Sequence, residues 1–256
     1  MTTPTCLPST ARLAGHLMLA ALLVVGNLCQ AEERTYRVAV IGHSPPLSYT
    51  DENGKLAGFN IEVAHEVCAT MQIRCQLQPM PIENIVDSVA ADDSAFAVVG
   101  FIPTPERQQR VLFSKTYFHS RSVWLAKPGV ALGKSQKPVA VIKGSAQARH
   151  AEAMGWNSIQ VVTQSDIPAL LSTGKADATL MPMLGALALL RDKSLQPLLL
   201  ESIILTDPTM SGPLHMLVSP KEAALVERLN AAIDQIKRDG RFDRLNSQFM
   251  PWFKIQ

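Results

Sequence analysis

The sequence predicts an α/β protein with two lobes, and three observations carry this prediction. Apolar, β-prone runs alternate with helical patterns from Thr35 to about Arg110, as in proteins with parallel sheets. A second series of the same kind starts after Gly129. No low-complexity linker separates the two series, and the change falls in the β-prone segment 120–127. We therefore expect extended strands to join the lobes, with the chain crossing between them more than once.

The first series begins with TYRVAVIG (35–42), which alternates and then becomes apolar, as a strand that enters a core does. The pair Asn53-Gly54 predicts a hairpin. Apolar residues at helical spacing then predict a helix over 59–72. The pattern repeats with a strand at CQLQPM (75–80), a helix at PIENIVDSVAA (81–91), a strand at AFAVVG (95–100) and a short helix at TPERQQR (104–110).

The second series gives strand, turn and helix within KPVAVIKGSAQARHAEAMG (137–155). After it we expect a strand at IQVVTQ (159–164), a helix at SDIPALLSTG (165–174), a strand at ADATLMP (176–182) and a helix at LGALALLRD (184–192). The last stretch contains a long amphipathic helix that ends at Gly240 and is followed by a shorter one. Its apolar face carries Leu225, Leu229, Ile233 and Ile236.

The first 31 residues have the layout of a secretory signal: one positive residue, an apolar core, and small residues before a cleavage site after Ala31. The apolar core, Leu17 to Gly26, is shorter than the about 20 residues of a membrane-spanning helix. A lipid anchor at Cys29 is disfavoured because Leu28 is bulky. We expect a soluble exported protein with four segments: signal peptide 1–31, first lobe 35–120, second lobe 121–210, and a return to the first lobe over 211–256.

Charge and cysteine usage narrow the class of protein. The formal net charge is +2, and no basic run indicates a nucleic-acid partner. Outside the signal segment the cysteines are Cys68 and Cys75, and an even pair in an exported chain predicts a local disulfide. Two free buried thiols are the alternative. Metal binding is less favoured, because no histidine falls at a supporting spacing, and we expect neither a metal nor a cofactor.

Arg107 lies where a helix disfavours a cation, three residues after the candidate N-cap Thr104 with Pro105 in the first helical position. It either pairs with its neighbour Glu106 or binds an anion through its guanidinium.

The motifs GxSxG, HExxH, Walker A and GxGxxG are absent. His43, after the first strand, either faces a cleft or is an ordinary loop histidine.

The turn KGSAQ (143–147) also follows a strand and opens a helix. There the amides of Ser145 and Ala146 are free to meet an anion. The alternative is a plain glycine turn with Ser145 as the N-cap. Because both helix starts follow the carboxyl ends of strands, a cleft between the lobes is the expected ligand site.

These segments resemble the bacterial family 3 solute-binding proteins. GKLAGFNIEVAHEVC (54–68) is similar to that family's glycine–phenylalanine–aspartate helix start, and TPERQQRVLFSKTYF (104–118) to its T-x-x-R segment. KGSAQ, GKADATL (174–180) and KRDGRFDRLNSQF (237–249) resemble its later motifs, and the match runs in order over 37–253. The cysteine spacing resembles the disulfide of the histidine and lysine/arginine/ornithine binding members.

The resemblance implies a type II periplasmic-binding-protein fold, with parallel-sheet lobes joined by hinge strands around a cleft. It implies a monomer that captures an amino acid or related carboxylate for an ABC permease in the inner membrane. By the resemblance, Arg107 grips the carboxylate, main-chain amides assist, and no residue is catalytic. The expected ligand-binding residues are Ser44, Ile82, Gly100, Ile102, Arg107, Ser145, Ala146, Gln147 and Pro182.

Three departures from the family pattern concern the ligand's ammonium group. Polar residues before the arginine are replaced by Val99, Gly100 and Ile102. The aspartate that usually receives the ammonium corresponds to Pro182, and the loop HSPP (43–46) lacks acidic and aromatic residues. The carboxylate half of the site thus survives and the ammonium half does not. The hypothesis is a small carboxylate ligand, either an amino acid held differently or a compound that is not an amino acid.

Two other functions remain open. An enzyme resembling cyclohexadienyl dehydratases would need a general acid in the cleft, for which Glu83 and Glu106 are candidates by proximity only. A sensor would pass the closed form to a membrane signalling partner instead of a permease.

Overall fold

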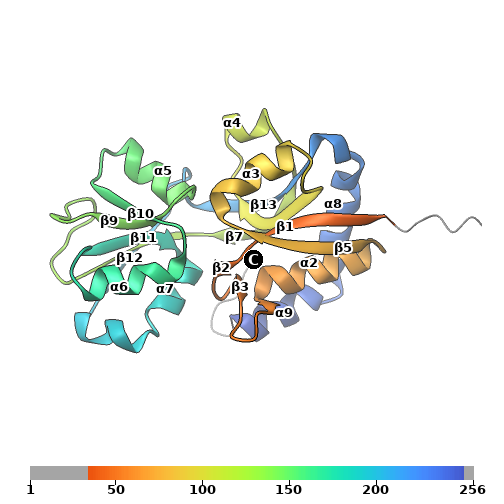
Figure 1. Cartoon of the computed structure of the whole chain (residues 1–256). Helices are drawn as coiled ribbons and strands as arrows, with labels where there is room; N and C mark the ends of the chain where they lie inside the picture. The colour runs from red at the N-terminus through yellow and green to blue at the C-terminus, as the bar shows by residue number, and fades with distance from the viewer. Residues whose placement is uncertain (1–33, 251–256) are drawn as a thin grey trace, which may run out of the picture. The chain divides into compact units, whose positions relative to one another are not determined.

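The computed structural model describes residues 34–250 and contains two sheet-based lobes (Figure 1). The expected signal peptide lies outside the described residues. Within them, no helix combines the length and the apolar character that crossing a membrane requires. The first lobe contains the orange, yellow and blue segments of Figure 1, and the second contains the green and cyan ones.

The first lobe is built on a five-stranded sheet with helices on both faces. In spatial order its strands are β5 (Arg74–Met80), β1 (Thr35–Ile41), β6 (Phe96–Phe101), β13 (Gly212–Val218) and β7 (Leu112–Ser120). One face packs against α2 (Phe59–Thr70), α8 (Ala224–Arg238) and α9 (Arg241–Phe249), and the other against α3 (Ile82–Ala90). The short helix α4 (Pro105–Gln108) follows β6.

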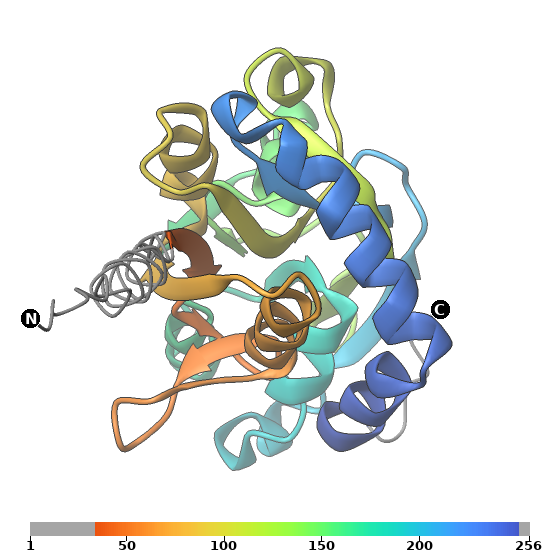
Figure 2. The ribbon, with the colours of Figure 1, turned by 90° about the vertical axis from the view of Figure 1, so that its right-hand side faces the viewer.

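The long helix near the carboxyl end, α8, forms as its apolar spacing predicts. Leu225, Leu229, Ile233 and Ile236 are all buried on one face, which packs on the sheet and on α2. Gly240 has φ of 78°, a left-handed conformation that suits glycine, and it separates α8 from α9. Figure 2 shows the two blue helices meeting at this turn. Burial of this apolar face is what fixes the return segment to the first lobe.

The second lobe repeats the arrangement. Its strands, in spatial order, are β10 (Ser158–Val161), β9 (Val139–Ile142), β11 (Ala178–Pro182), β8 (Ser122–Ala126) and β12 (Glu201–Leu205). Helix α5 (Ala146–Ala153) covers one face. The other face is covered by α6 (Ile167–Ser172), α7 (Met183–Leu189) and the 3-10 helix η3 (Lys193–Leu198). Two further 3-10 helices are η2 (Gln164–Asp166) and η4 (Pro220–Glu222).

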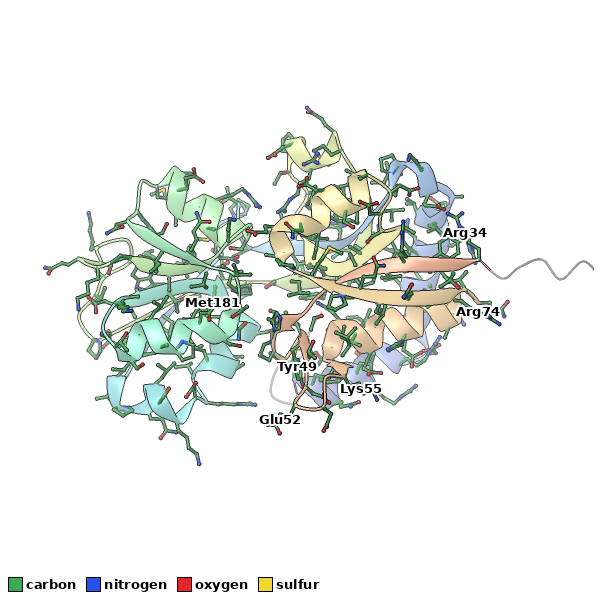
Figure 3. All side chains as sticks on the ribbon, viewed as in Figure 1. Arg34, Tyr49, Glu52, Lys55, Arg74 and Met181 are labelled. Carbon is green, nitrogen blue, oxygen red and sulfur yellow. A yellow bond between two sulfur atoms is a disulfide. The ribbon has the colours of Figure 1, made fainter. Side chains whose placement is uncertain are left out.

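A small sheet stands beside the first lobe. It comprises β2 (His43–Ser44), β3 (Ser48–Thr50) and β4 (Leu56–Ala57), all antiparallel. The hairpin expected at Asn53-Gly54 joins β3 to β4, where Tyr49 pairs with Ala57. Figure 3 labels Tyr49, Glu52 and Lys55 along this hairpin and places Met181 in the second lobe.

Both sheets contain the expected parallel pairs, and each also contains antiparallel strands. In the first lobe β1 runs parallel to β5 and β6, but β13 runs antiparallel to β6 and β7. In the second lobe β8 runs antiparallel to β11 and β12. The antiparallel strands are those by which the chain leaves one lobe or arrives in the other. A crossing strand enters the sheet without a preceding crossover helix, so nothing forces it to be parallel.

The chain crosses between the lobes in two places. Strand β7 of the first lobe continues into β8 of the second through Arg121 alone, and residues 206–211 lead from β12 to β13. The two crossings are joined, because Ser122 N–H donates to Ser211 Oγ at 2.9 Å and Ser122 Oγ donates to the Met210 carbonyl at 2.7 Å. Extended hinge strands were expected from the sequence, whereas the lobe boundaries at 120/121 and 210/211 stay predictions.

Candidate functional site

A cleft lies between the two lobes, with about 860 Å³ of empty space including its open mouth. The first lobe supplies the end of β1, the β6 strand and its following loop, and the second supplies the ends of β9 and β11 with the start of α5. All nine residues expected from the sequence line this cleft: Ser44, Ile82, Gly100, Ile102, Arg107, Ser145, Ala146, Gln147 and Pro182.

Arg107 is the cation of the cleft. Thr104 caps α4, since its Oγ1 accepts a hydrogen bond from the Arg107 amide at 3.3 Å, with Pro105 in the first helical position. The guanidinium lies over the Phe101 ring, 4.4 Å from the centroid, and its Nη1 donates to the Ile102 carbonyl at 3.0 Å. The side chain is only 7% exposed. Stacking and this hydrogen bond fix the plane of the guanidinium, so the remaining donors are held ready for a ligand.

The charge on Arg107 is not neutralised by the protein. Within residues 34–250 no carboxylate lies at ion-pair distance from its guanidinium, so the alternative of a local pair with Glu106 is not met. Burial, followed by the nearby charge of Arg149, lowers the pKa of Arg107 to about 9, against a smaller opposite effect of Glu106. A buried cation that lacks a counter-ion is costly, and a bound anion would remove that cost.

The start of α5 faces Arg107 from the second lobe. Ser145 is its N-cap, and its Oγ accepts a hydrogen bond from the Ala148 amide at 3.0 Å. The expectation that the Ser145 amide serves as a donor is not met, because this N–H donates to the Ile142 carbonyl at 3.1 Å, closing the turn. The next amides, of Ala146 and Gln147, belong to the first turn, where the helix supplies no acceptor. They are therefore the amides of this helix start whose N–H groups have no acceptor within the helix.

Gln147 is buried at the edge of the cleft, and its amide group is already engaged. Its Nε2 donates to Ser122 Oγ at 2.9 Å and to the Met210 carbonyl at 3.4 Å. Because a carbonyl can only accept, these two contacts identify the nitrogen, and the side-chain oxygen is left as the acceptor. Gln147 thereby links the cleft to the hinge, since Ser122 and Met210 belong to the two crossings.

Gly100 forms part of the first-lobe wall and has φ of 90°. A Cβ here would lie 2.9 Å from the Tyr117 hydroxyl and 3.0 Å from Leu214 Cδ1, so only glycine fits. Below it, Tyr117 donates to Asn60 Oδ1 at 3.1 Å and Asn60 Nδ2 donates to the Val99 carbonyl at 3.3 Å. Burial raises the pKa of the Tyr117 hydroxyl, which keeps it protonated as a donor. These two buried hydrogen bonds hold the wall of the cleft in place.

The lobes touch on both sides of the cleft, as in a closed conformation. Gly144 of the second lobe lies against Glu83 at the start of α3, and Lys143 Nζ is 3.1 Å from Glu83 Oε2. Gln164 of the second lobe, which is buried, donates from Nε2 to the Pro45 carbonyl at 3.1 Å. These contacts hold the two lobes together at both sides of the cleft.

Sequence reasoning did not identify several lining residues. Most are apolar and carry no chemical signature that a linear sequence reveals: Ile41, Leu47, Phe118, Ile142, Val162, Met210 and Leu214. His43 lines the cleft as an exposed residue, which corresponds to the first of its two interpretations. A signal for Met210 would have been its position in the second crossing, which lies at the base of the cleft.

A side pocket adjoins the cleft behind Arg107. It is lined by charged residues of both signs, namely Glu83, Asp87, Glu106, Arg107, Arg110 and Arg149. Arg149 Nη1 donates to the Gly144 carbonyl at 3.1 Å, while its buried Nη2 has no hydrogen-bond partner in the described part of the chain. The two candidate general acids, Glu83 and Glu106, thus line this pocket and not the cleft.

The family model of bacterial extracellular solute-binding proteins, family 3, matches residues 36–252. The chain belongs to this family. The ABC transporter arginine-binding protein 1 of Escherichia coli is 25% identical over 251 residues, which cover 92% of this chain and 98% of that protein. Family 3 members are periplasmic or extracellular solute-binding proteins, and the solute-binding role is therefore established for this chain.

Solved structures give the same fold. An ancestral arginine-binding protein bound to arginine superposes with a TM-score of 0.75 at 24% identity, over 85% of this chain and 99% of that one. An ancestral amino acid-binding protein described as a precursor of cyclohexadienyl dehydratase gives 0.72 at 21% identity, over 91% and 99%. The chain is therefore a family 3 protein with the two-lobed type II fold. As expected from the sequence, a disulfide joins Cys68 to Cys75.

Proposed function

We propose that this family 3 protein captures a small carboxylate-bearing solute, an amino acid or a related compound, in the periplasm. The protein acts as a monomer and hands the solute to an ABC permease in the inner membrane. The segment 1–31 directs export to the periplasm. The two lobes then close about the hinge and enclose the solute.

One observation carries the proposal: the Arg107 guanidinium is buried in the cleft without a carboxylate partner among residues 34–250. Arginine matches a carboxylate with two parallel hydrogen bonds, and burial strengthens each of them. The Ala146 and Gln147 amides reach the same cleft from the other lobe. A carboxylate bound by both lobes stabilises the closed state, because the open state keeps only one half of its contacts.

Relatives supply the biological setting. The Escherichia coli relative is named as an arginine-binding protein of an ABC transporter, and the ancestral structure is described with arginine bound. The same use in transport is proposed here, whereas arginine itself is not proposed as the ligand. The Escherichia coli relative is only 25% identical to this chain. The T-x-x-R motif at residues 104–107 supports binding of a carboxylate, and it does not specify the rest of the ligand.

The test is Arg107→Ala against the wild type, with carboxylate binding followed by calorimetry. The expected result is loss of binding of every carboxylate, since the cation that offsets the ligand's desolvation is gone. The melting temperature of the empty protein should change little, because Arg107 has no ion pair to lose in the described chain.

A matched control is Arg110→Ala, three residues further on. Arg110 is exposed and pairs with Asp87 at 2.6 Å, and it does not line the cleft. This variant should bind as the wild type does. Normal carboxylate binding by Arg107→Ala would refute the proposal.

The enzyme alternative needs a general acid beside the substrate. Glu83 is 3.1 Å from Lys143, and Glu106 lies beside Arg107 and Arg149, so neither candidate belongs to the cleft lining. These positions favour binding over dehydration. Incubation with prephenate decides between them, since a dehydratase consumes it and a binding protein does not. For the sensor alternative, neighbouring genes discriminate: a permease favours transport, whereas a histidine kinase or cyclase favours signalling.

A further inference from the structure

The lining of the cleft is mostly apolar on both sides, although His43, Ser44 and Ser120 also belong to it. Ile41, Ile82 and Phe118 line it from the first lobe, and Ile142, Val162 and Met210 from the second. Closure therefore brings apolar surface onto the ligand from two directions. A ligand with an apolar body gains from this burial, whereas a polar body loses its hydration without replacement.

Among residues 34–250, no aspartate or glutamate lines the cleft. The nearest acids lie in the side pocket. Glu83 is paired with Lys143, and Glu106 faces the charges of Arg107 and Arg149. A cationic group on the ligand would thus find no counter-ion inside the cleft.

The neutral polar side chains that line the cleft include His43, Ser44, Ser120 and Gln147. The Ile102 carbonyl accepts from Arg107, and Ser145 Oγ accepts from the Ala148 amide. The side-chain oxygen of Gln147 is the acceptor that its contacts leave over. Neutral acceptors of this kind suit a hydroxyl or oxo substituent, but they do not supply the opposite charge that an ammonium group requires when it leaves water.

Two nearby cations act in the same direction. Arg107 and Arg149 both line the side pocket, and each lacks a carboxylate at ion-pair distance in the described chain. Acids line this pocket as well, but Arg107 is the charged residue that also lines the cleft, where it attracts a carboxylate and repels an ammonium group placed next to it. Like-charge contact in a desolvated site is among the stronger ways to exclude a ligand.

We propose that the cleft selects a carboxylic acid with an apolar body and no ammonium group, and that it rejects the corresponding amino acid. The proposal rests on the proposed function, in which Arg107 holds the carboxylate. The proposed function concerns only the carboxylate. The present inference adds that the mostly apolar lining from both lobes selects the rest of the ligand.

The first experiment compares matched ligands by calorimetry on the full mature protein. The pairs are leucine with 4-methylpentanoate and phenylalanine with 3-phenylpropanoate; arginine and the primary amides of the two acids complete the set. We expect at least one acid to bind about 100-fold more tightly than its amino acid, with arginine and the amides not binding.

The outcomes separate the two proposals. If an amino acid binds as tightly as its acid while the amides fail, the present inference is overturned and the carboxylate grip stands. If the amides bind as tightly as the acids, the proposed function itself is overturned. If neither acid binds at millimolar concentration, the inference is also overturned, because an apolar cleft of this kind should accept such compounds.

The second experiment restores a negative charge. Pro182 lines the cleft and is the N-cap of α7, a position where aspartate and asparagine are both favoured, so Pro182→Asp and Pro182→Asn should fold equally well. We expect Pro182→Asp to narrow the gap between acid and amino acid by about tenfold relative to Pro182→Asn. Melting temperatures of the empty variants control for folding. Equal preferences in the two variants would show that a missing charge is not what excludes the ammonium group, and would overturn the inference.

Discussion

A Cβ placed on Gly144 would lie 2.8 Å from the Cα of Glu83, across the boundary between the lobes. Gly144 belongs to the turn between β9 and α5, and Glu83 to the first turn of α3. The contact is backbone against backbone, so no side-chain rotation can relieve a larger residue. Gly144 therefore marks how closely the lobes approach each other, and it makes closure sensitive to a single methyl group.

We predict that Gly144→Ala weakens closure and with it ligand binding. Its φ of 76° adds strain of about 1–2 kcal/mol for any residue with a Cβ. The clash with Glu83 comes on top of that strain and exists only in the closed state. Calorimetry with the best-binding acid of the matched set should show a loss of affinity of about tenfold or more.

Gly155→Ala is the matched control for that strain. Gly155 has φ of 66° in the same lobe, and a Cβ there would meet nothing within 4 Å. Both variants should lower the melting temperature of the empty protein by a similar few degrees, but Gly155→Ala should keep the affinity of the wild type. Equal affinities in the two variants would mean that Gly144 has no part in closure.

The ion pair beside this contact should matter far less. Lys143 Nζ lies 3.1 Å from Glu83 Oε2, but the Lys143 side chain is 55% exposed. Solvent screens such a pair, so Lys143→Met should weaken binding only about two- to fivefold at low salt, and less in high salt. Lys127→Met is the control, because Lys127 pairs with Asp177 within the second lobe at 2.9 Å. A large loss that persists in high salt would contradict this prediction.

The elements that follow local rules could be predicted from the sequence. The buried strand AFAVVG, the cap and proline of TPER, and the apolar face of the last long helix all appear where expected. The predicted contact residues line a single cleft because they follow the carboxyl ends of strands, and the order of elements brings these ends together. Whether these residues contact a ligand stays a prediction.

What could not be predicted depends on contacts distant in sequence. Strand β13, GPLHMLV, inserts antiparallel between β6 and β7 after a crossing from the second lobe, and no local pattern specifies that partner. The same holds for Val162 and Met210, ordinary apolar residues that become part of a site only when the lobes meet. The Ser145 amide was misjudged because its bond to Ile142 closes a turn whose geometry the letters KGS do not reveal.

The disulfide should stabilise the first lobe without affecting the ligand. Cys68 and Cys75 are seven residues apart in the chain and join the end of α2 to β5, and neither lines the cleft. Closing so short a loop contributes about 2–3 kcal/mol in the chain-entropy model. The double variant Cys68→Ser/Cys75→Ser should melt roughly 5–10 °C lower. Its affinity for the best-binding acid should equal that of the wild type at a temperature where both are folded, and a changed affinity would contradict the separation of disulfide and site.

Binding of a carboxylate should also depend on pH through Arg107. Burial, and then the charge of Arg149, lowers the pKa of this guanidinium to about 9 in the empty protein. A carboxylate binds the protonated form, so affinity should be level near neutral pH and fall as the pH rises above about 9, by up to tenfold per unit. Calorimetry between pH 7 and pH 10.5 measures this fall, with the acid itself ionised throughout.

The stability of the empty protein should respond to the same group with the opposite sign. The pKa of Arg107 is lower in the folded protein than its ordinary value, so the unfolded chain binds more protons above about pH 9. This group therefore makes folding more favourable as the pH rises above that value, and unfolding through Arg107 cannot explain a loss of affinity there. Arg149→Gln removes the repelling charge and should move the fall in affinity to higher pH. A pH profile that is flat to pH 10.5 in the wild type, or unchanged in Arg149→Gln, would show that the two guanidinium groups do not interact as their positions indicate.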